Sequence, residues 1–276
     1  MASMESLAAT KALYESQGDL RSLRTTLVAV TSVKALSEAE QKLFKQALPE
    51  DLVFTTEETI FHAQGGGQPS DTGHMLVYAD PEGDSQVASF QVQSVRRTAN
   101  GTILHRGRLE PPEATVRVDS HVEQHVDGDS RDLFSRIHTG GHVLGLAVRQ
   151  LGSKIPSVVE TKAQHYPDAA FVEFQGKIEA HHSESIQEVL DDLVQQDLPV
   201  TVSWLDTVSL QEKGIHLANN FSRESAPEST RVVEIGELGG YPCGGTHCHS
   251  TSKLGRVVVG KISNRKGNTQ IRYTVT

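Results

Sequence analysis

The alternation of apolar and polar residues divides the chain into a strand-rich first part and a mixed second part. Short apolar stretches broken by Gly, Pro, Asn and Asp predict strands at residues 23–30, 52–61, 73–78, 87–97 and 102–107. Ser37, with Glu40 three residues later, has the form of a capping box and predicts a short helix over residues 37–47. Short strands at such close spacing are typical of a small β-barrel.

The period of the apolar positions changes after Pro111 and Pro112. A helical period predicts one helix over residues 131–151 and a second over residues 184–195. Strands are expected at residues 169–174, 200–204, 230–235, 256–262 and 269–275. The expected fold class is therefore α+β, with a small N-terminal β-barrel domain at residues 1–113 and a mixed α+β domain with an antiparallel sheet at residues 114–276.

Composition favours a soluble globular protein, because 37% of the 276 residues are hydrophobic and 22% are charged. No apolar stretch approaches the roughly 20 residues that span a bilayer, so no membrane partner is expected. The N-terminus lacks the apolar core of a signal peptide. The two cysteines, Cys243 and Cys248, lie close together and do not form the widely spread framework of a secreted protein, which favours a reducing, cytoplasmic compartment.

Charge is distributed unevenly along the chain. The net charge of −9 argues against nucleic-acid binding over the whole surface. Residues 253–276, however, contain basic side chains and no acidic ones, namely Lys253, Arg256, Lys261, Arg265, Lys266 and Arg272. This segment is either a local surface for phosphate contacts or the solvated face of a strand.

Two pairs of residues have the chemistry and spacing of metal ligands. His138 and His142 lie four residues apart, which places both imidazoles on one face of the predicted helix. That pair alone is weak evidence, because His121 and His125 have the same spacing. Cys243 and a following histidine stand in a glycine-rich loop, where a thiolate and an imidazole suit a tetrahedral zinc site.

Together the two pairs predict a zinc ion held by four side chains in the second domain: His138, His142, Cys243 and His247. Cys248 is the alternative to His247 as the fourth ligand. The helix pair is not a metalloprotease signature, because Thr139 stands where those enzymes have a glutamate.

A third element is the glycine run that precedes Gln68. Consecutive glycines let a ligand approach the main chain, although such runs also mark ordinary turns. The run matches neither the phosphate-loop pattern nor the dinucleotide fingerprint.

These three motifs, in this order, resemble those of the editing domain of alanyl-tRNA synthetase and of its free-standing relatives, the AlaX-type alanyl-tRNA editing proteins. They are GGGQPSDTG at residues 65–73, HTGGHVL at residues 138–144 and CGGTH at residues 243–247. Residues 165–174 and 256–275 add to the resemblance, which extends from about residue 50 onward. Gly140 departs from the alanine often found after His-Thr, and this bears on the width of the pocket and the preferred amino acid.

The resemblance implies hydrolysis in trans of mischarged tRNA(Ala), chiefly seryl- and sometimes glycyl-tRNA(Ala), with the acceptor end of the tRNA as partner. Gln68 and Asp71 are then the candidate catalytic residues. Gly66 and Gly67 are candidates to bind the carbonyl or ribose, and Thr72 and Thr246 to bind the seryl hydroxyl. The candidate tRNA contacts are Lys261, Arg265, Lys266 and Arg272.

Two other functions fit the same residues. One is a non-catalytic, zinc-stabilised module that binds tRNA or a protein partner. The other is a hydrolase for a different aminoacyl-tRNA. Zinc itself is expected to orient the substrate, because four protein ligands leave no open position for direct activation of water.

Overall fold

A computed structural model describes residues 7–79, 85–155, 158–217 and 228–276. Its contacts divide the chain into two compact units. The first unit contains residues up to 65 and residues 69–131, and the second contains residues 66–68 and 132–276. The short segment 66–68 therefore belongs, by its contacts, with the second unit.

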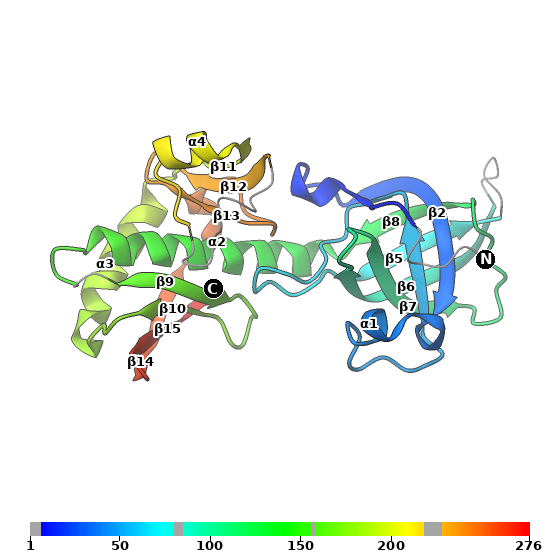
Figure 1. Ribbon diagram of the computed structural model, residues 1–276, viewed down its shortest axis with the longest axis horizontal. Coiled ribbons are helices and arrows are strands. Elements are labelled where there is room, and N and C mark those ends of the chain that lie inside the picture. Colours follow the sequence, from blue (N-terminus) through cyan, green and yellow to red (C-terminus); the bar gives the residue numbers. More distant parts are fainter. Residues whose placement is uncertain (1–6, 80–84, 156–157, 218–227) are drawn as a thin grey trace. The chain divides into compact units, whose positions relative to one another are not determined.

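The first unit is built on a closed β-barrel with the strand order β2-β3-β7-β6-β5-β8 (Figure 1). The strands are β2 (Ser22–Ser32), β3 (Leu52–Thr56), β5 (Gly73–Tyr78), β6 (Gln86–Arg97), β7 (Ile103–Glu110) and β8 (His121–Val126). A parallel pair of two-residue strands, β1 (Lys11–Ala12) and β4 (Glu58–Thr59), lies outside the barrel sheet. The predicted small barrel is confirmed.

The barrel core follows from the two-residue period of its strands. Along β8, the buried positions Val122, Gln124 and Val126 alternate with partly exposed ones. Phe54 and Phe90 stack inside the barrel with their ring centroids 3.8 Å apart. Gln124 is buried but satisfied, because its amide bonds to side-chain and main-chain groups near residues 56–60.

β8 determines where the barrel ends along the chain. It pairs with β2 and β5, so the barrel includes residues beyond the boundary expected near residue 113, and the first unit extends to Arg131. β8 also carries His121 and His125, whose spacing equals that of a helical ligand pair. On a strand these residues share a partly exposed barrel face and do not belong to the candidate metal cluster.

The helix predicted over residues 37–47 is shorter in the structure. The capping box of Ser37 and Glu40 forms as expected, but α1 spans only Glu38–Gln41. The chain then turns, which lets Phe44 pack with Val33 and Leu36 in a small separate cluster. Tertiary packing of these apolar residues outweighs the helical period here.

The second unit is α+β, as predicted. Its helices are α2 (Gly128–Gln150), whose first residues belong to the first unit, α3 (Ser183–Gln195) and α4 (Thr207–Glu212). One antiparallel sheet has the order β14-β15-β10-β9, formed by β14 (Val257–Arg265), β15 (Asn268–Val275), β10 (Phe171–Gln175) and β9 (Val159–Gln164). The other has the order β11-β12-β13, formed by β11 (Val200–Leu205), β12 (Thr230–Ile235) and β13 (Gly240–Pro242).

The two sheets of this unit lie on opposite sides of α2 (Figure 1). Apolar side chains of α2, of α3 and of both sheets join in one core, which includes Leu144, Leu190, Val172 and Val233. A helix surrounded in this way is buried over most of its circumference, and polar residues on it therefore need partners. Among the described residues, no helix has both the length and the apolar composition to cross a membrane.

Candidate metal centre

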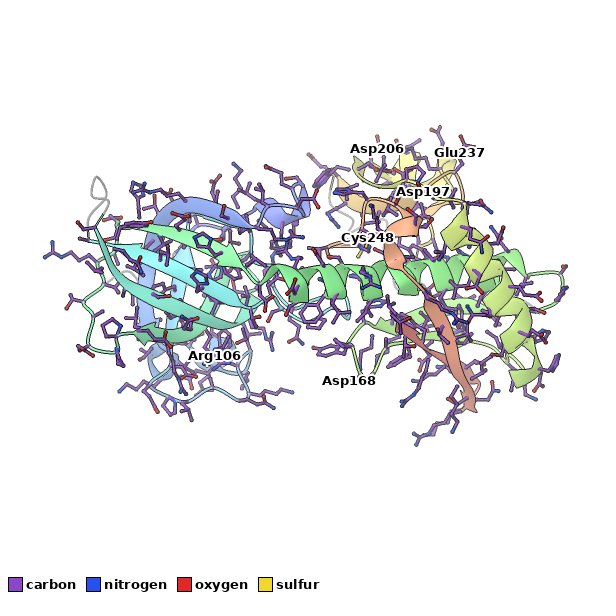
Figure 2. The ribbon with its side chains drawn as sticks, turned by 180° about the vertical axis from the view of Figure 1, so that it is seen from behind. Arg106, Asp168, Asp197, Asp206, Glu237 and Cys248 are labelled. Atoms are coloured by element: carbon purple, nitrogen blue, oxygen red, sulfur yellow. The ribbon has the colours of Figure 1, made fainter. Side chains whose placement is uncertain are left out.

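The four side chains predicted to bind metal lie together in the second unit. α2 carries His138 and His142, and the loop that follows β13 carries Cys243 and His247. One possible ligand atom from each residue lies within 4.8 Å of the others. The Cys243 Sγ atom is 3.3 Å from Nε2 of His138 and 3.3 Å from Nε2 of His247. Cys248, labelled in Figure 2, is not part of this group.

The tautomer of His138 follows from its hydrogen bonds to Gln68. Oε1 of Gln68 accepts the main-chain N–H of Thr246 at 3.0 Å, while its Nε2 donates to Oγ1 of Thr246 at 2.8 Å. Nδ1 of His138 is 2.7 Å from the same Oε1, so this nitrogen must carry a proton and donate it. Nε2 of His138 is then unprotonated and faces Cys243.

The same reasoning fixes the tautomer of His247. The hydroxyl of Thr139 donates to the carbonyl of Ser135 at 2.8 Å, because a carbonyl can only accept. Oγ1 of Thr139 therefore accepts from Nδ1 of His247, at 3.1 Å, and from the main-chain N–H of Cys248, at 3.1 Å. Nε2 of His247 is left unprotonated, and it too faces Cys243.

The resulting arrangement fits a metal ion better than it fits a hydrogen-bonded core. Two unprotonated nitrogens lie 3.3 Å from one sulfur atom, that of Cys243, which has a single proton to donate. A cation at the centre would be bound by all three lone pairs. Hydrogen bonds to the outer ring nitrogens are also what orients histidines that bind metals. Three imidazoles and a thiolate are a donor set that suits zinc.

His142, the fourth member, is 6% exposed. Burial lowers its pKa well below the usual value of 6.5, and His165, Arg149 and Arg231 nearby lower it further, so the ring is neutral, as a metal ligand must be. Its Nδ1 is buried and has no hydrogen-bond partner among the described residues. An orphaned ring nitrogen beside three candidate ligands is a further sign that the cluster is completed by a bound group.

Burial also raises the pKa of the Cys243 thiol, although the main-chain N–H of Gly245 and the charge of Arg231 lower it. Arg231 donates hydrogen bonds to the carbonyls of Cys243 and Gly245, which fixes the loop that carries the thiol. In the metal-free chain the thiol is therefore protonated at neutral pH, and metal binding would release that proton.

Glycines on α2 and in the loop provide the space that the cluster requires. A Cβ atom on Gly245 would lie 2.3 Å from Cε1 of His138 and 2.5 Å from Oε1 of Gln68. A Cβ atom on Gly141 would lie 2.4 Å from the ring of His165, and one on Gly145 would lie 2.3 Å from Oε2 of Glu160. The helical glycines thus admit polar side chains to the helix backbone, at a cost in helix propensity of about 1 kcal/mol each.

The two residues predicted to be catalytic have different surroundings. Gln68 is fully buried in the second unit, and its amide is bonded to His138 and Thr246. Asp71 belongs to the first unit, where its carboxylate accepts bonds from Arg131 and from the main-chain N–H of His62. Gln68 thus supports a candidate ligand, whereas Asp71 forms a buried ion pair within the barrel unit.

The candidate substrate-binding residues are also divided between the units. Gly66 and Gly67 belong to the second unit and have positive φ values of 56° and 79°. The carbonyl of Gly67 accepts the N–H of His165, so this segment lies against the end of β9. The hydroxyl of Thr246 is occupied by Gln68 and by Ser135, at 2.7 Å.

Thr72 lies in the first unit, at the edge of a cavity of about 670 Å³ that His74 and Asp127 also line. Another buried carboxylate of this unit, Asp51, pairs at 2.6 Å with Arg106 of β7, and Figure 2 labels this arginine.

The candidate tRNA contacts lie on the hairpin of β14 and β15. Lys261, Arg265, Lys266 and Arg272 are all exposed. Lys266 and the following Gly267 have φ values of 51° and 83°, the combination of a two-residue hairpin turn that matches the strand twist. These positive charges are thus presented to solvent on one β-hairpin.

Sequence reasoning missed two groups of residues around the cluster. His165 and Tyr273 form one group: the ring of His165 stacks on His138, and its Nδ1 is 2.6 Å from the Tyr273 hydroxyl. The only sequence signal for His165 was its position at the start of residues 165–174, a segment that adds to the resemblance to alanyl-tRNA editing domains.

Glu160, Arg149 and Tyr241 form the second group, beside His142. The Tyr241 ring lies 4.4 Å from that of His142, and Arg149 donates to the Tyr241 hydroxyl at 3.0 Å. Burial raises the pKa of Glu160 to about 7, while Arg149 and the Tyr241 hydroxyl lower it. No spacing in the sequence indicates this group, because its members come from three separate elements.

Comparison with known proteins shows which sequences this chain is similar to. Residues 230–272 match the family described as the threonyl and alanyl tRNA synthetase second additional domain. The matched segment runs from β12 into β15 and includes Cys243 and His247.

Longer matches are found to alanyl-tRNA editing proteins. The chain is 28% identical over 236 residues to the alanyl-tRNA editing protein AlaX-M of Methanosarcina barkeri, covering 83% of this chain and 91% of that protein. It is 28% identical over 236 residues to AlaX-L of Pyrococcus horikoshii, covering 84% of this chain and 54% of that protein. Over most of its length the chain is thus similar to AlaX-type alanyl-tRNA editing proteins.

Alanine–tRNA ligases are related to the same chain over a smaller share of their length. The chain is 30% identical over 209 residues to the enzyme of Halorubrum lacusprofundi, covering 74% of this chain and 20% of that enzyme. The chain thus spans about a fifth of this ligase.

Proposed function

We propose that the protein is an editing hydrolase that deacylates mischarged tRNA(Ala), chiefly Ser-tRNA(Ala) and also Gly-tRNA(Ala), at a zinc site. The observation that carries this proposal is the cluster in which two unprotonated histidine nitrogens face the thiol of Cys243, each 3.3 Å away. Support comes from the similarity to AlaX-M along 91% of that protein, whose name describes alanyl-tRNA editing.

His138, His142, Cys243 and His247 would hold the zinc ion. When bound, zinc supplies a fixed positive charge that orients and polarises an oxygen or nitrogen of the aminoacyl ester. Gln68 and Thr139 have a supporting role, because each accepts the Nδ1–H of one histidine and turns its Nε2 inward.

The main-chain groups of Gly66 and Gly67 are the candidates to contact the ester carbonyl or the terminal ribose. Asp71 is assigned a structural role as the partner of Arg131, and not the role of a base, since both of its carboxylate oxygens are bonded.

The acceptor end of tRNA is the proposed partner, and the exposed hairpin of β14 and β15 is the proposed surface that binds it. Phosphate contacts through Lys261, Arg265, Lys266 and Arg272 would make binding salt-dependent. Replacing Arg265 and Lys266 with alanine should weaken tRNA binding. It should also make the negative slope of log K against log salt less steep, by about 0.7 to 0.9 for each phosphate that is no longer neutralised. A tRNA filter-binding series in salt measures both, and an unchanged slope would remove the hairpin from the interface.

A deacylation assay tests the function. The protein should release serine from Ser-tRNA(Ala) and glycine from Gly-tRNA(Ala), lose this activity on chelation, and regain it when zinc is returned. The variant His138→Ala should lose both zinc and activity. Undiminished activity after demonstrated loss of zinc would contradict the proposed role of the metal.

The same assay separates two other functions. A non-catalytic module would bind tRNA without releasing the amino acid. A hydrolase for another aminoacyl-tRNA would release a different amino acid from a panel of mischarged tRNAs and leave Ser-tRNA(Ala) intact.

A further inference from the structure

His165 is a buried histidine beside the metal cluster that the cluster itself does not use. It is 1% exposed, and its ring stacks on His138 with centroids 4.2 Å apart and an angle of 26° between the planes. Gly141 makes this approach possible, because a Cβ atom there would lie 2.4 Å from Cε1 of His165. The main chain of His165 is also fixed, since its N–H donates to the carbonyl of Gly67.

Tyr273 determines which nitrogen of His165 carries the proton. The hydroxyl of Tyr273 is 2.9 Å from the carbonyl of Ile137 and must donate to it, because a carbonyl only accepts. The contact of 2.6 Å between Nδ1 of His165 and the same hydroxyl therefore requires Nδ1 to be the donor. Nε2 is left with a lone pair and no proton.

Nε2 of His165 can accept a hydrogen bond. It makes no hydrogen bond within the described part of the chain, where Nδ1 of the same ring has the Tyr273 hydroxyl as its partner. A donor group beside the cluster could therefore bond to it. The hydroxyl of Thr246, by contrast, is occupied by Gln68 and Ser135.

We propose that Nε2 of His165 accepts a hydrogen bond from the side-chain hydroxyl of the seryl group, so that His165 sets the preference for seryl over glycyl esters. This inference rests on the proposed editing function. A neutral O–H donor suits the position, because an ammonium group would bring a second positive charge beside a divalent cation. A glycyl ester has no hydroxyl, and it leaves the acceptor unpaired.

The test compares His165→Phe with the matched variant His181→Phe, which changes an exposed histidine outside the cluster. Phenylalanine keeps a stacking ring and removes the acceptor. We expect the ratio of kcat/KM for Ser-tRNA(Ala) to that for Gly-tRNA(Ala) to fall about ten- to a hundredfold in His165→Phe, the loss expected for an unpaired hydrogen bond in a buried site. The ratio should not change in His181→Phe. Zinc content is measured in each preparation.

The variant Tyr273→Phe keeps the inference testable if His165→Phe does not fold. Without the Tyr273 hydroxyl, nothing selects the tautomer with a free Nε2, and the same ratio should fall, by a smaller factor. Equal losses with the two esters would overturn the inference, since they indicate a structural role or the orientation of water. An unchanged ratio would overturn it as well. Failure of the unaltered protein to deacylate either ester would instead refute the proposed function.

Discussion

Two buried polar networks, one in each unit, take side chains from the same short segment and have opposite properties. In the barrel unit, Asp71 and Arg131 pair charge with charge, and Arg131 also donates to the carbonyls of Gly18 and Ile60. In the second unit, Gln68 supports a cluster in which lone pairs face one another. The first network is satisfied by the chain alone and stabilises the fold. The second could hold a metal ion, and we propose that it is the functional one.

The largest expected effect on stability comes from breaking the ion pair between Arg131 and Asp71 in the barrel unit. Arg131→Met removes the guanidinium and leaves the buried carboxylate of Asp71 without its counter-charge. The free energy of unfolding should fall by about 3–5 kcal/mol, as for other broken buried pairs. Urea unfolding followed by circular dichroism measures the loss. Combining it with Asp71→Asn should recover part of the stability, and a loss as small as that of an exposed pair would show that the network is not structural.

The next effect concerns Glu160, a buried carboxyl whose charge is poorly compensated. Its pKa is about 7 in the folded chain against an ordinary value of 4.5, so the folded state holds its proton more tightly than the unfolded state does. Stability must then decrease as pH rises from about 4.5 to 7 and level off above that range. Glu160→Gln should remove this dependence.

The expected gain from Glu160→Gln in the metal-free protein is up to roughly 3 kcal/mol at pH 8 and close to zero at pH 4.5. Thermal and urea unfolding at the two pH values, in the presence of a chelator, measure it. A gain of equal size at both pH values would show that the substitution acts through packing and not through the charge of Glu160.

A smaller effect, on zinc affinity, distinguishes the role of Gln68 from that of Asp71. Gln68→Leu removes the acceptor for Nδ1 of His138, so the ring loses its orientation. Zinc affinity should fall about 10–100-fold, the usual cost of losing such support. Asp71→Asn, three residues away in the same loop, is the control and should leave zinc affinity near that of the unaltered protein. Competition with a chromogenic chelator measures both, and the reverse order would exchange the roles assigned to the two residues.

The smallest effect is expected at Thr139. Thr139→Val removes the oxygen that accepts from Nδ1 of His247 and from the N–H of Cys248. The loss of one neutral hydrogen bond to a ligand corresponds to roughly 0.5–1.5 kcal/mol, and zinc affinity should fall accordingly. Thr139→Ser keeps the hydroxyl and should restore the affinity. If both variants bind zinc equally, the hydroxyl does not select the tautomer of His247.

Sequence patterns predicted those parts of the molecule that depend on local periods. The helical period placed His138 and His142 on one face of α2, and the two-residue period predicted the barrel strands. The spacing of His121 and His125 carries no such information, because the same interval lies on β8. Only the secondary structure of the surrounding chain distinguishes the two pairs.

The partners of buried polar groups could not be predicted in this way. Asp71 and Gln68 are three residues apart, and nothing local indicates that one meets Arg131 while the other meets His138 and Thr246. Likewise, Nδ1 of His165 meets a hydroxyl 108 residues later in the chain. Such pairs are formed by the packing of distant elements, and a single sequence does not contain the register that brings them together.

The most direct test of the central claim is X-ray absorption at the zinc K-edge of the purified, zinc-loaded protein. We expect one zinc ion per chain, with one sulfur at about 2.3 Å and three imidazole nitrogens at about 2.0–2.1 Å. The sulfur contribution should disappear in Cys243→Ser. A zinc environment without sulfur, or one with two sulfurs, would contradict a site built from His138, His142, Cys243 and His247.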